Sequence, residues 1–497
     1  MMQLKELQIR INGNPFYSFR FSMTNKFSSL FSIFLFISAS AFAQKDTLMH
    51  NIELTIKNFP AAKAYLCYYY GNQTFLLDSV TVDSPAGFMH FKSRKKLPDG
   101  MYFIATKDMR LFDFIIANEK NIIISTTFKN LYDSAVVQSR ENSIFFEYMR
   151  QTNKTALDVE NVQETTKMLN RATKDKKILA EQAGKIRQLY KNSDSTSRAL
   201  INAYPTLFVT KLLKAHQPLQ MPENIKPYTA ANRFNPDYGY YYRRHFWDNF
   251  DFSDVSYLHA PFYTTKVDEY LQNTIPKQPD SLNAYVDILL SRTKITPEYF
   301  KYTLRYITQL CDDNLKNAFS ENLLVHIVDV YHRDTASGTD KYTLERLDYK
   351  ANTFRTHLIG TKAPAFSLPD STGKSRDFQE FSSAYTLLIF FSVQCTHCQE
   401  QIPQFRDALQ FTDSSIIKTF AVCTDGIRET WLPFIEKNKS DWVNVLDTQT
   451  NSNIQKSYAA FSLPVVYLLD KDKKIIAKHL TPDMLKKILE QIHGKEK

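Results

Sequence analysis

Residues 386–400 constrain this 497-residue chain more than any other segment, because they predict a buried strand, two cysteines and a helix in immediate succession. Residues 387–391 are continuously apolar, as in a strand that is covered on both faces. Apolar residues then recur at helical spacing from Ile402 to Leu409, and Pro403 within that spacing predicts a kink. Cys395 therefore begins a helix, whose dipole and free N–H groups favour a thiolate over a thiol.

Four interpretations of the motif Cys395-Thr396-His397-Cys398 are open. A redox-active dithiol is favoured, because one sulfur attacks a disulfide and the second resolves the mixed disulfide. A structural disulfide would close a very short loop and so add little loop entropy. A zinc site would need a second CxxC or CxxH pair, which the sequence lacks. The fourth interpretation is an inert pair that serves binding.

The last quarter of the chain, from about Gly360, resembles the TlpA/ResA family of extracytoplasmic thiol–disulfide oxidoreductases, which have a thioredoxin-like fold. The resemblance rests on the opening sequence IGTKAPAFSL at 359–368, on the CTHC motif, on Pro403, and on Pro464 within SLPVVY. Pro464 matches the cis-proline of the family. The resemblance implies no cofactor and no metal.

The motif and the resemblance together assign roles to individual residues. Cys395 is expected to be the exposed nucleophile and Cys398 the shielded resolving thiol, with a reversible disulfide between them. Thr396 and His397 are expected to tune the pair, and a charged His397 would stabilise the reduced form; the alternative is an exposed histidine without influence. Leu463 and Pro464 are expected to pair with an extended substrate.

Two positions depart from the family pattern. Gln394 stands where a tryptophan often precedes the first cysteine, and Ile389 stands where thioredoxin itself has a buried acid. The usual proton acceptor for the resolving thiol is therefore missing, and water or a distant carboxylate must replace it.

The length predicts three domains and a multidomain α+β fold. Residues 44–140 alternate apolar and polar side chains between turn signals, which predicts an N-terminal antiparallel β-sandwich-like domain. Residues 141–355 carry apolar residues every three to four positions, which predicts an α-helical middle domain. Residues 356–497 are expected to form the C-terminal thioredoxin-like α/β domain.

Residues 1–43 are predicted to be a signal peptide. A mainly apolar run at 27–39 follows Lys26, and the small residues of Ala41-Phe42-Ala43 predict cleavage after Ala43. Met23 would give this signal an ordinary length, so the true start of the protein is expected there. Without a cysteine near the cut, a lipoprotein is not expected. The protein is predicted to be periplasmic or in the cell envelope, where disulfides persist.

The net charge and the positions of the cysteines limit which binding partners are expected. The formal charge of +10 includes +3 from residues 1–43, and the remaining excess is not clustered, so nucleic-acid binding is not expected. Cys67, Cys311 and Cys423 lie in apolar segments and are expected to be buried thiols. The expected partners are protein dithiols or disulfides and a membrane-bound redox partner.

Residues 238–254 are the most unusual stretch outside the CTHC motif, with aromatic side chains between charged ones. A metal site from His245, Asp248, Asp251 and Asp254 is conceivable, but one histidine among carboxylates is weak evidence. The favoured interpretation is an aromatic core whose polar groups satisfy helix ends and turns; a docking face for a partner is the third.

The sequence thus predicts an exported oxidoreductase that exchanges disulfides with proteins through Cys395 and Cys398. The alternative is a non-catalytic binding or scaffold protein of the cell envelope that carries a thioredoxin-like module. Reversible cycling of the two thiols distinguishes these predictions.

Overall fold

The computed structural model describes residues 48–83, 86–172, 175–225, 236–313, 318–410, 416–425, 427–438, 441–449 and 452–495. The predicted signal peptide and its cleavage site after Ala43 lie outside these residues. The chain divides into two compact units, with the boundary between Ile275 and Pro276, inside the predicted helical domain. No helix in the described ranges is both long and apolar enough to span a bilayer.

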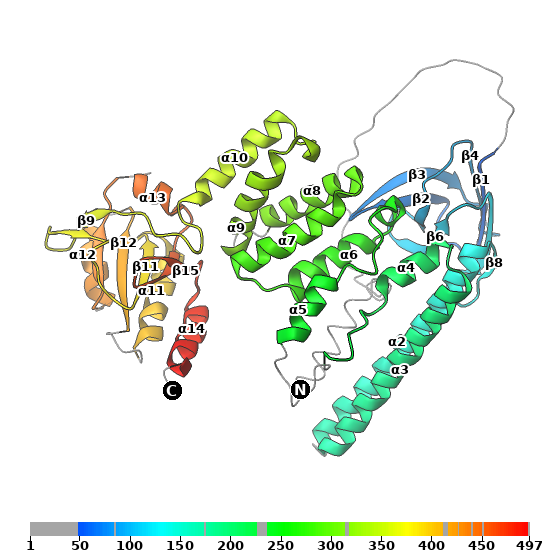
Figure 1. Ribbon diagram of the computed structural model, residues 1–497, viewed down its shortest axis with the longest axis horizontal. Helices are drawn as coiled ribbons and strands as arrows, with labels where there is room; N and C mark the ends of the chain where they lie inside the picture. Colours follow the sequence, from blue (N-terminus) through cyan, green and yellow to red (C-terminus); the bar gives the residue numbers. More distant parts are fainter. Residues whose placement is uncertain are drawn as a thin grey trace. The chain divides into compact units, whose positions relative to one another are not determined.

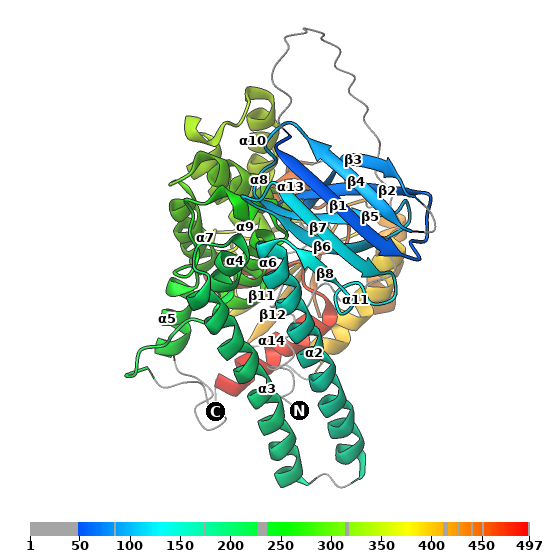
Figure 2. The same ribbon diagram turned by 90° about the vertical axis from the view of Figure 1, so that its right-hand side faces the viewer.

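Two four-stranded sheets open the first unit (Figure 1, Figure 2). One has the order β4-β1-β7-β8 and the other β3-β2-β5-β6. Alternate side chains of β1, such as Ile52, Leu54 and Ile56, are buried, as the period of two predicts. The predicted N-terminal β-domain is confirmed, but β1 pairs with β7 in parallel, so the pairing is not wholly antiparallel. The strands are β1 (His50–Lys57), β2 (Lys63–Tyr70), β3 (Gln73–Thr81), β4 (Phe88–Ser93), β5 (Gly100–Ala105), β6 (Arg110–Ile116), β7 (Asn121–Thr127) and β8 (Val136–Gln138).

Helices complete the first unit. The long helices α2 (Arg140–Ala172) and α3 (Lys176–Ala203) lie side by side as a hairpin (Figure 1). Glu141 of α2 accepts hydrogen bonds from the backbone N–H groups of Phe208 and Val209, and so caps the next helix, α4 (Phe208–His216). The remaining elements are α5 (Pro236–His245), η1 (Val255–His259), α6 (Phe262–Glu269) and η2 (Tyr270–Thr274).

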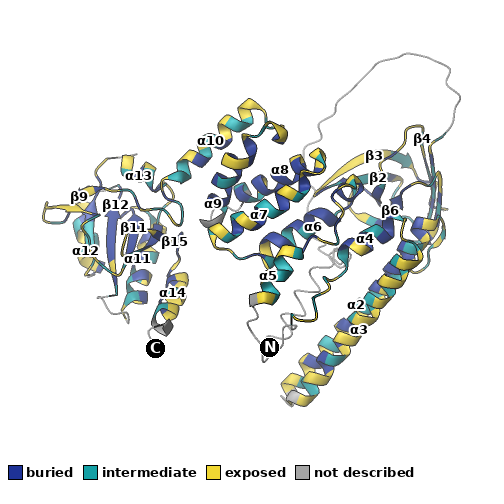
Figure 3. Ribbon diagram, in the orientation of Figure 1, coloured by how far each residue is buried: buried dark blue, intermediate teal, exposed yellow. Residues whose placement is uncertain are grey.

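The second unit begins with a helical layer, whose helices carry both buried and exposed residues (Figure 3). Helix α8 begins at Pro297, a residue type that is favoured at the first helical position, and it buries Phe300, Leu304 and Ile307 on one face. The elements of this layer are α7 (Pro279–Thr293), α8 (Pro297–Asp313), α9 (Ala318–Ile327), η3 (Val328–His332), η4 (Thr335–Ser337) and α10 (Lys341–Arg355).

A five-stranded sheet of order β13-β12-β11-β14-β15 forms the C-terminal domain. β11 (Tyr385–Phe391), β12 (Ile417–Cys423) and β13 (Val443–Leu446) are parallel, whereas β14 (Val465–Asp470) and β15 (Ile475–Lys478) run antiparallel to their neighbours. Successive residues of β11 enter two different apolar clusters, one on each face of the sheet. Because β11 is buried on both faces, the apolar run at residues 387–391 is continuous.

Four helices accompany this sheet: α11 (Thr396–Leu409), α12 (Arg428–Asn438), α13 (Asn453–Ser457) and α14 (Pro482–Lys495). In the chain they follow β11, β12, β13 and β15 respectively. The small hairpin of β9 (Ser367–Pro369) and β10 (Ser375–Asp377) was not anticipated, because three-residue strands leave no periodic signal. The multidomain α+β fold, with β, helical and thioredoxin-like α/β regions in this order, is confirmed.

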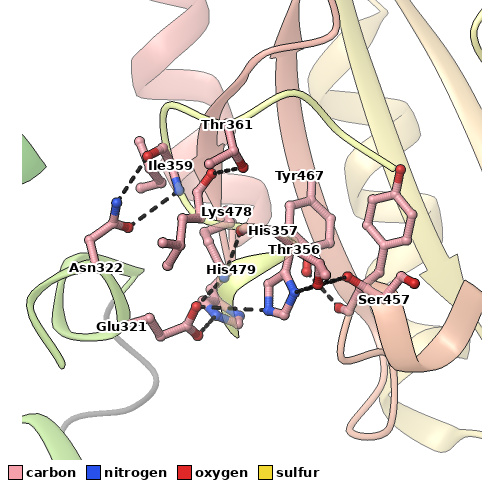
Figure 4. A network of polar contacts seen from close by, with 12 residues as sticks. Glu321, Asn322, Thr356, His357, Ile359, Thr361, Ser457, Tyr467, Lys478 and His479 are labelled. Atoms are coloured by element: carbon pink, nitrogen blue, oxygen red, sulfur yellow. Dashed lines mark hydrogen bonds and ion pairs between the residues drawn. The ribbon is translucent and has the colours of Figure 1, made fainter. Parts of the chain in front are cut away.

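A buried polar network joins α9 to the C-terminal sheet (Figure 4). The carboxylate of Glu321 pairs with Lys478 and accepts a hydrogen bond from His479, whose Nε2 lies 2.9 Å away. The Lys478 ammonium also donates to the backbone oxygen of His357 at 3.2 Å. Because Lys478 and Glu321 are almost fully buried, each needs the other to stay charged inside the protein.

Candidate redox site

Cys395 is the N-cap residue of α11, as the sequence predicts. Its sulfur accepts a hydrogen bond from the backbone N–H of Cys398 at 3.3 Å, and the side chain is half-buried. A sulfur in this position faces the free N–H groups at the start of a helix, where negative charge is stabilised. A half-buried sulfur thus lies at the helix start where the sequence predicts the first cysteine of the pair.

Cys398 has the opposite environment. Its side chain is fully buried, in the apolar cluster that holds Phe391 and Phe405. Burial raises the pKa of the Cys398 thiol well above its ordinary value, and the neighbouring Cys395 sulfur raises it further. The two cysteines are free thiols in this structure, so the disulfide between them stays a prediction.

Leu463 and Pro464 lie beside the reactive sulfur. The Cys395 S–H donates to the backbone oxygen of Leu463 at 3.6 Å, and the peptide bond between Leu463 and Pro464 is cis. The loop before β14 thus comes to the start of α11, although 68 residues separate Cys395 from Leu463. Their role in binding substrate stays a prediction.

Thr396 and His397 are both exposed on the first turn of α11. Within the described residues, no side-chain hydrogen bond or ion pair of His397 is present. The position is compatible with tuning of the cysteine pair and equally with the alternative of an exposed histidine without influence. Ile389, at the position of thioredoxin's buried acid, is fully buried in β11.

Asp425 is the site residue that sequence reasoning missed. It follows β12, and its carboxylate accepts hydrogen bonds from the Ser392 hydroxyl, from the Val393 N–H at 3.3 Å and from the Cys423 S–H at 3.5 Å. Its negative charge is one of the causes that raise the pKa of Cys398. A signal was available: Ser392 and Asp425 each come just after one of two neighbouring parallel strands, and such strand ends meet at one edge of the sheet.

The aromatic segment 238–254 belongs to the core of the first unit. Trp247, Phe250 and Phe252 are buried against one another, as the favoured interpretation of the sequence has it. The four polar residues of the conceivable metal site do not converge on a common point. His245 bonds to Asp248 at 2.6 Å, Asp251 accepts from Ser253, and Asp254 caps η1 and pairs with Lys211.

The three cysteines outside the CTHC motif differ in how far they are buried. Cys311 and Cys423 are buried, as expected, whereas Cys67 is half-buried. Burial raises the pKa of all three thiols, to about 11 for Cys67 and to about 12 for Cys311 and Cys423.

Comparison with known proteins finds matches for two parts of the chain. Residues 359–478 match the model of the AhpC/TSA family. The C-terminal domain is a thioredoxin-like domain. The preceding helical region, residues 195–355, matches a domain of unknown function, DUF5106.

The sequence relatives are thiol–disulfide oxidoreductases named ResA. The protein from Bacillus thuringiensis subsp. konkukian is 24% identical over 137 residues, which cover 27% of this chain and 78% of that protein. The protein from Geobacillus thermodenitrificans is 25% identical, also over 137 residues, which cover 27% of this chain and 78% of that protein. This similarity covers 27% of the chain, so it carries no information on the remaining residues.

Solved structures also resemble this chain. A thioredoxin-like protein from Bacteroides caccae is 21% identical, with a TM-score of 0.42, and the match covers 55% of this chain and 100% of that one. A domain of a possible thiol-disulfide isomerase from Cytophaga hutchinsonii is 34% identical, with a TM-score of 0.26, over 28% of this chain and 95% of that one.

Proposed function

We propose that this protein is an exported thiol–disulfide oxidoreductase that exchanges disulfides with protein substrates through Cys395 and Cys398. The observation that carries the proposal is the asymmetry of the pair. The sulfur of Cys395 is accessible at a helix start, whereas Cys398, whose backbone N–H is 3.3 Å away, is buried. This arrangement permits a nucleophile that meets the substrate and a second thiol that meets only the first.

In the reducing direction, the Cys395 thiolate attacks one sulfur of a substrate disulfide. A bond forms between Cys395 and the substrate, and the other substrate sulfur leaves as a thiolate and takes a proton. Cys398 then loses its proton and attacks the Cys395 sulfur. This step releases the second substrate thiol and leaves a disulfide between Cys395 and Cys398. Two electrons pass to the substrate, and the reverse sequence oxidises a dithiol.

The proton of Cys398 needs an acceptor, because burial holds this thiol in its neutral form. Asp425 supplies the carboxylate that is absent at Ile389, and the Ser392 hydroxyl holds it at the end of β12. We assign Asp425 the role of proton acceptor in the resolving step. Leu463 and Pro464 border the Cys395 sulfur, and we assign the backbone of this loop the role of pairing with an extended substrate segment.

An exported dithiol also needs an external source or sink of electrons, and the proposal includes a membrane-bound redox partner for that purpose. The test uses the full chain without residues 1–43, with insulin as substrate and dithiothreitol as the electron donor. Wild type is expected to turn over, Cys395→Ser to lose all turnover, and Cys398→Ala to accumulate a mixed disulfide. Cys311→Ala is the matched control, because Cys311 lies in α8 and takes no part in the contacts around Cys395, and it is expected to keep its turnover. A wild-type pair that does not cycle between dithiol and disulfide contradicts the proposal and favours the scaffold alternative.

A further inference from the structure

A cavity of about 220 Å³ lies among the helices of the first unit. Its walls come from α2, α3, α4, α5 and α6, which Figure 1 labels, and one wall is built by the aromatic segment 238–254. The redox chemistry uses none of these residues. The volume is below the range of roughly 300–1,000 Å³ for sites that hold drug-sized ligands, so the cavity fits a smaller molecule.

Two opposite charges line this cavity without neutralising each other directly. Lys266 and Glu269 are three residues apart on α6, a spacing at which side chains are neighbours and often pair. Among the described residues, however, neither forms an ion pair. The Lys266 ammonium instead lies 4.3 Å from the ring centre of Phe246 and 5.6 Å from that of Trp247.

Both charges are poorly solvated. Burial lowers the pKa of Lys266 to about 8, and the attraction of Glu269 offsets only part of this effect. Burial likewise raises the pKa of Glu269, although Lys266 opposes the shift. His216 lines the same cavity as a neutral ring, because burial and the charge of Lys266 hold its pKa well below the ordinary value. Asp194 of α3 is the remaining carboxylate in the lining.

A hydroxyl group without a partner completes the lining. The Tyr190 Oη atom is buried and has no hydrogen-bond partner in the described part of the chain. Such a group destabilises a protein by about 1–3 kcal/mol unless something else bonds to it. This hydroxyl and the two charged side chains line the same cavity.

We infer that the cavity binds a free α-amino acid in its zwitterionic form. An anion alone would pair with Lys266 but face the like charge of Glu269, and a cation alone would meet the reverse problem. A zwitterion satisfies both, with its carboxylate on Lys266 and Tyr190 and its ammonium on Glu269. The aromatic rings of Tyr242 and Phe262 supply an apolar wall for its side chain.

Isothermal titration calorimetry of the full chain without residues 1–43 tests this inference, with each of the twenty L-amino acids as a separate probe. For each one that binds, the N-acetyl derivative removes the positive charge and the amide derivative removes the negative charge. We expect saturable binding of at least one amino acid, and binding at least about tenfold weaker for both derivatives. The inference is overturned if no amino acid binds up to about 10 mM, or if either derivative binds as tightly as its parent.

Variants locate the site. Lys266→Met and Glu269→Gln are each expected to weaken binding at least about tenfold, and Tyr190→Phe several-fold. Lys185→Met and Glu181→Gln are matched controls, because this pair is exposed on α3 and does not line the cavity; both are expected to bind like wild type. Tyr190→Phe removes one oxygen atom and keeps the shape of the ring, so it remains informative if a charge variant does not fold. If the two single variants Tyr190→Phe and Lys266→Met both bind with wild-type affinity, the assignment of the site is wrong.

Discussion

The hydroxyl of Ser392 donates a hydrogen bond to the carboxylate of Asp425, and this contact joins the carboxyl ends of the neighbouring strands β11 and β12. Ser392 is three residues before Cys395, so the contact also fixes the loop that leads into α11. The backbone N–H of Val393 donates to the same carboxylate. A negative charge is thereby held at the base of the redox motif, although the position usual for a buried acid holds Ile389.

Replacement of Asp425 by asparagine is expected to slow the resolving step by about 100-fold or more at neutral pH, because the proton acceptor for Cys398 is lost. The lifetime of the mixed disulfide, measured by acid quench and mass spectrometry, reports this step. Ser392→Ala keeps the carboxylate and is expected to have a smaller effect. Equal lifetimes in Asp425→Asn and wild type would rule out this role, even if the cysteine pair is active.

Alkylation of the reduced native protein is expected to begin at Cys395. With a pKa of about 11 or 12, less than about 0.1% of Cys67, Cys311 and Cys423 is thiolate at pH 7.5, and the thiolate is the reacting form. Iodoacetamide labelling followed by peptide mass spectrometry gives the order. All five cysteines are expected to react at similar rates in urea, since burial is then removed. Labelling of Cys398 before Cys395 would contradict the proposed roles.

Glu321→Gln is expected to destabilise the second unit by about 3–5 kcal/mol, because it leaves the buried ammonium of Lys478 without its carboxylate. The double variant Glu321→Gln/Lys478→Met is expected to regain much of the loss, since no unpaired charge remains. Urea unfolding followed by circular dichroism measures both. Glu147→Gln is the control, because its pair with Arg150 is exposed and is expected to contribute less than about 1 kcal/mol.

Stability is expected to fall as the pH decreases from about 6.5 to about 4. Burial lowers the pKa of His357 and of His332 to about 4. Between these pH values the unfolded chain therefore binds more protons than the folded one, and each histidine contributes on the order of 1–3 kcal/mol to the loss.

Thermal unfolding at several pH values checks this pH dependence. His357→Gln is expected to give a shallower slope than wild type. An unchanged slope in His357→Gln would show that this histidine is not responsible.

Local patterns in the sequence were enough to predict the strand, the helix and the cysteine pair around Cys395. A strand buried on both faces must be continuously apolar, and a helix must repeat its apolar residues every three to four positions, so both leave a mark within a few neighbouring residues. Local patterns also favoured a core of aromatic side chains around Trp247 over a metal site.

Tertiary structure alone decided which distant groups meet. Asp425 reaches Ser392 because β12 lies beside β11, and Glu321 reaches Lys478 across 157 residues of chain. Lys266 and Glu269, in contrast, are close in sequence and line the same cavity, yet among the described residues they form no ion pair with each other. A periodic pattern in the sequence shows which face of a single helix or strand is buried. Contacts between distant residues depend instead on the order and packing of several elements, and periodicity within one element contains no information on these.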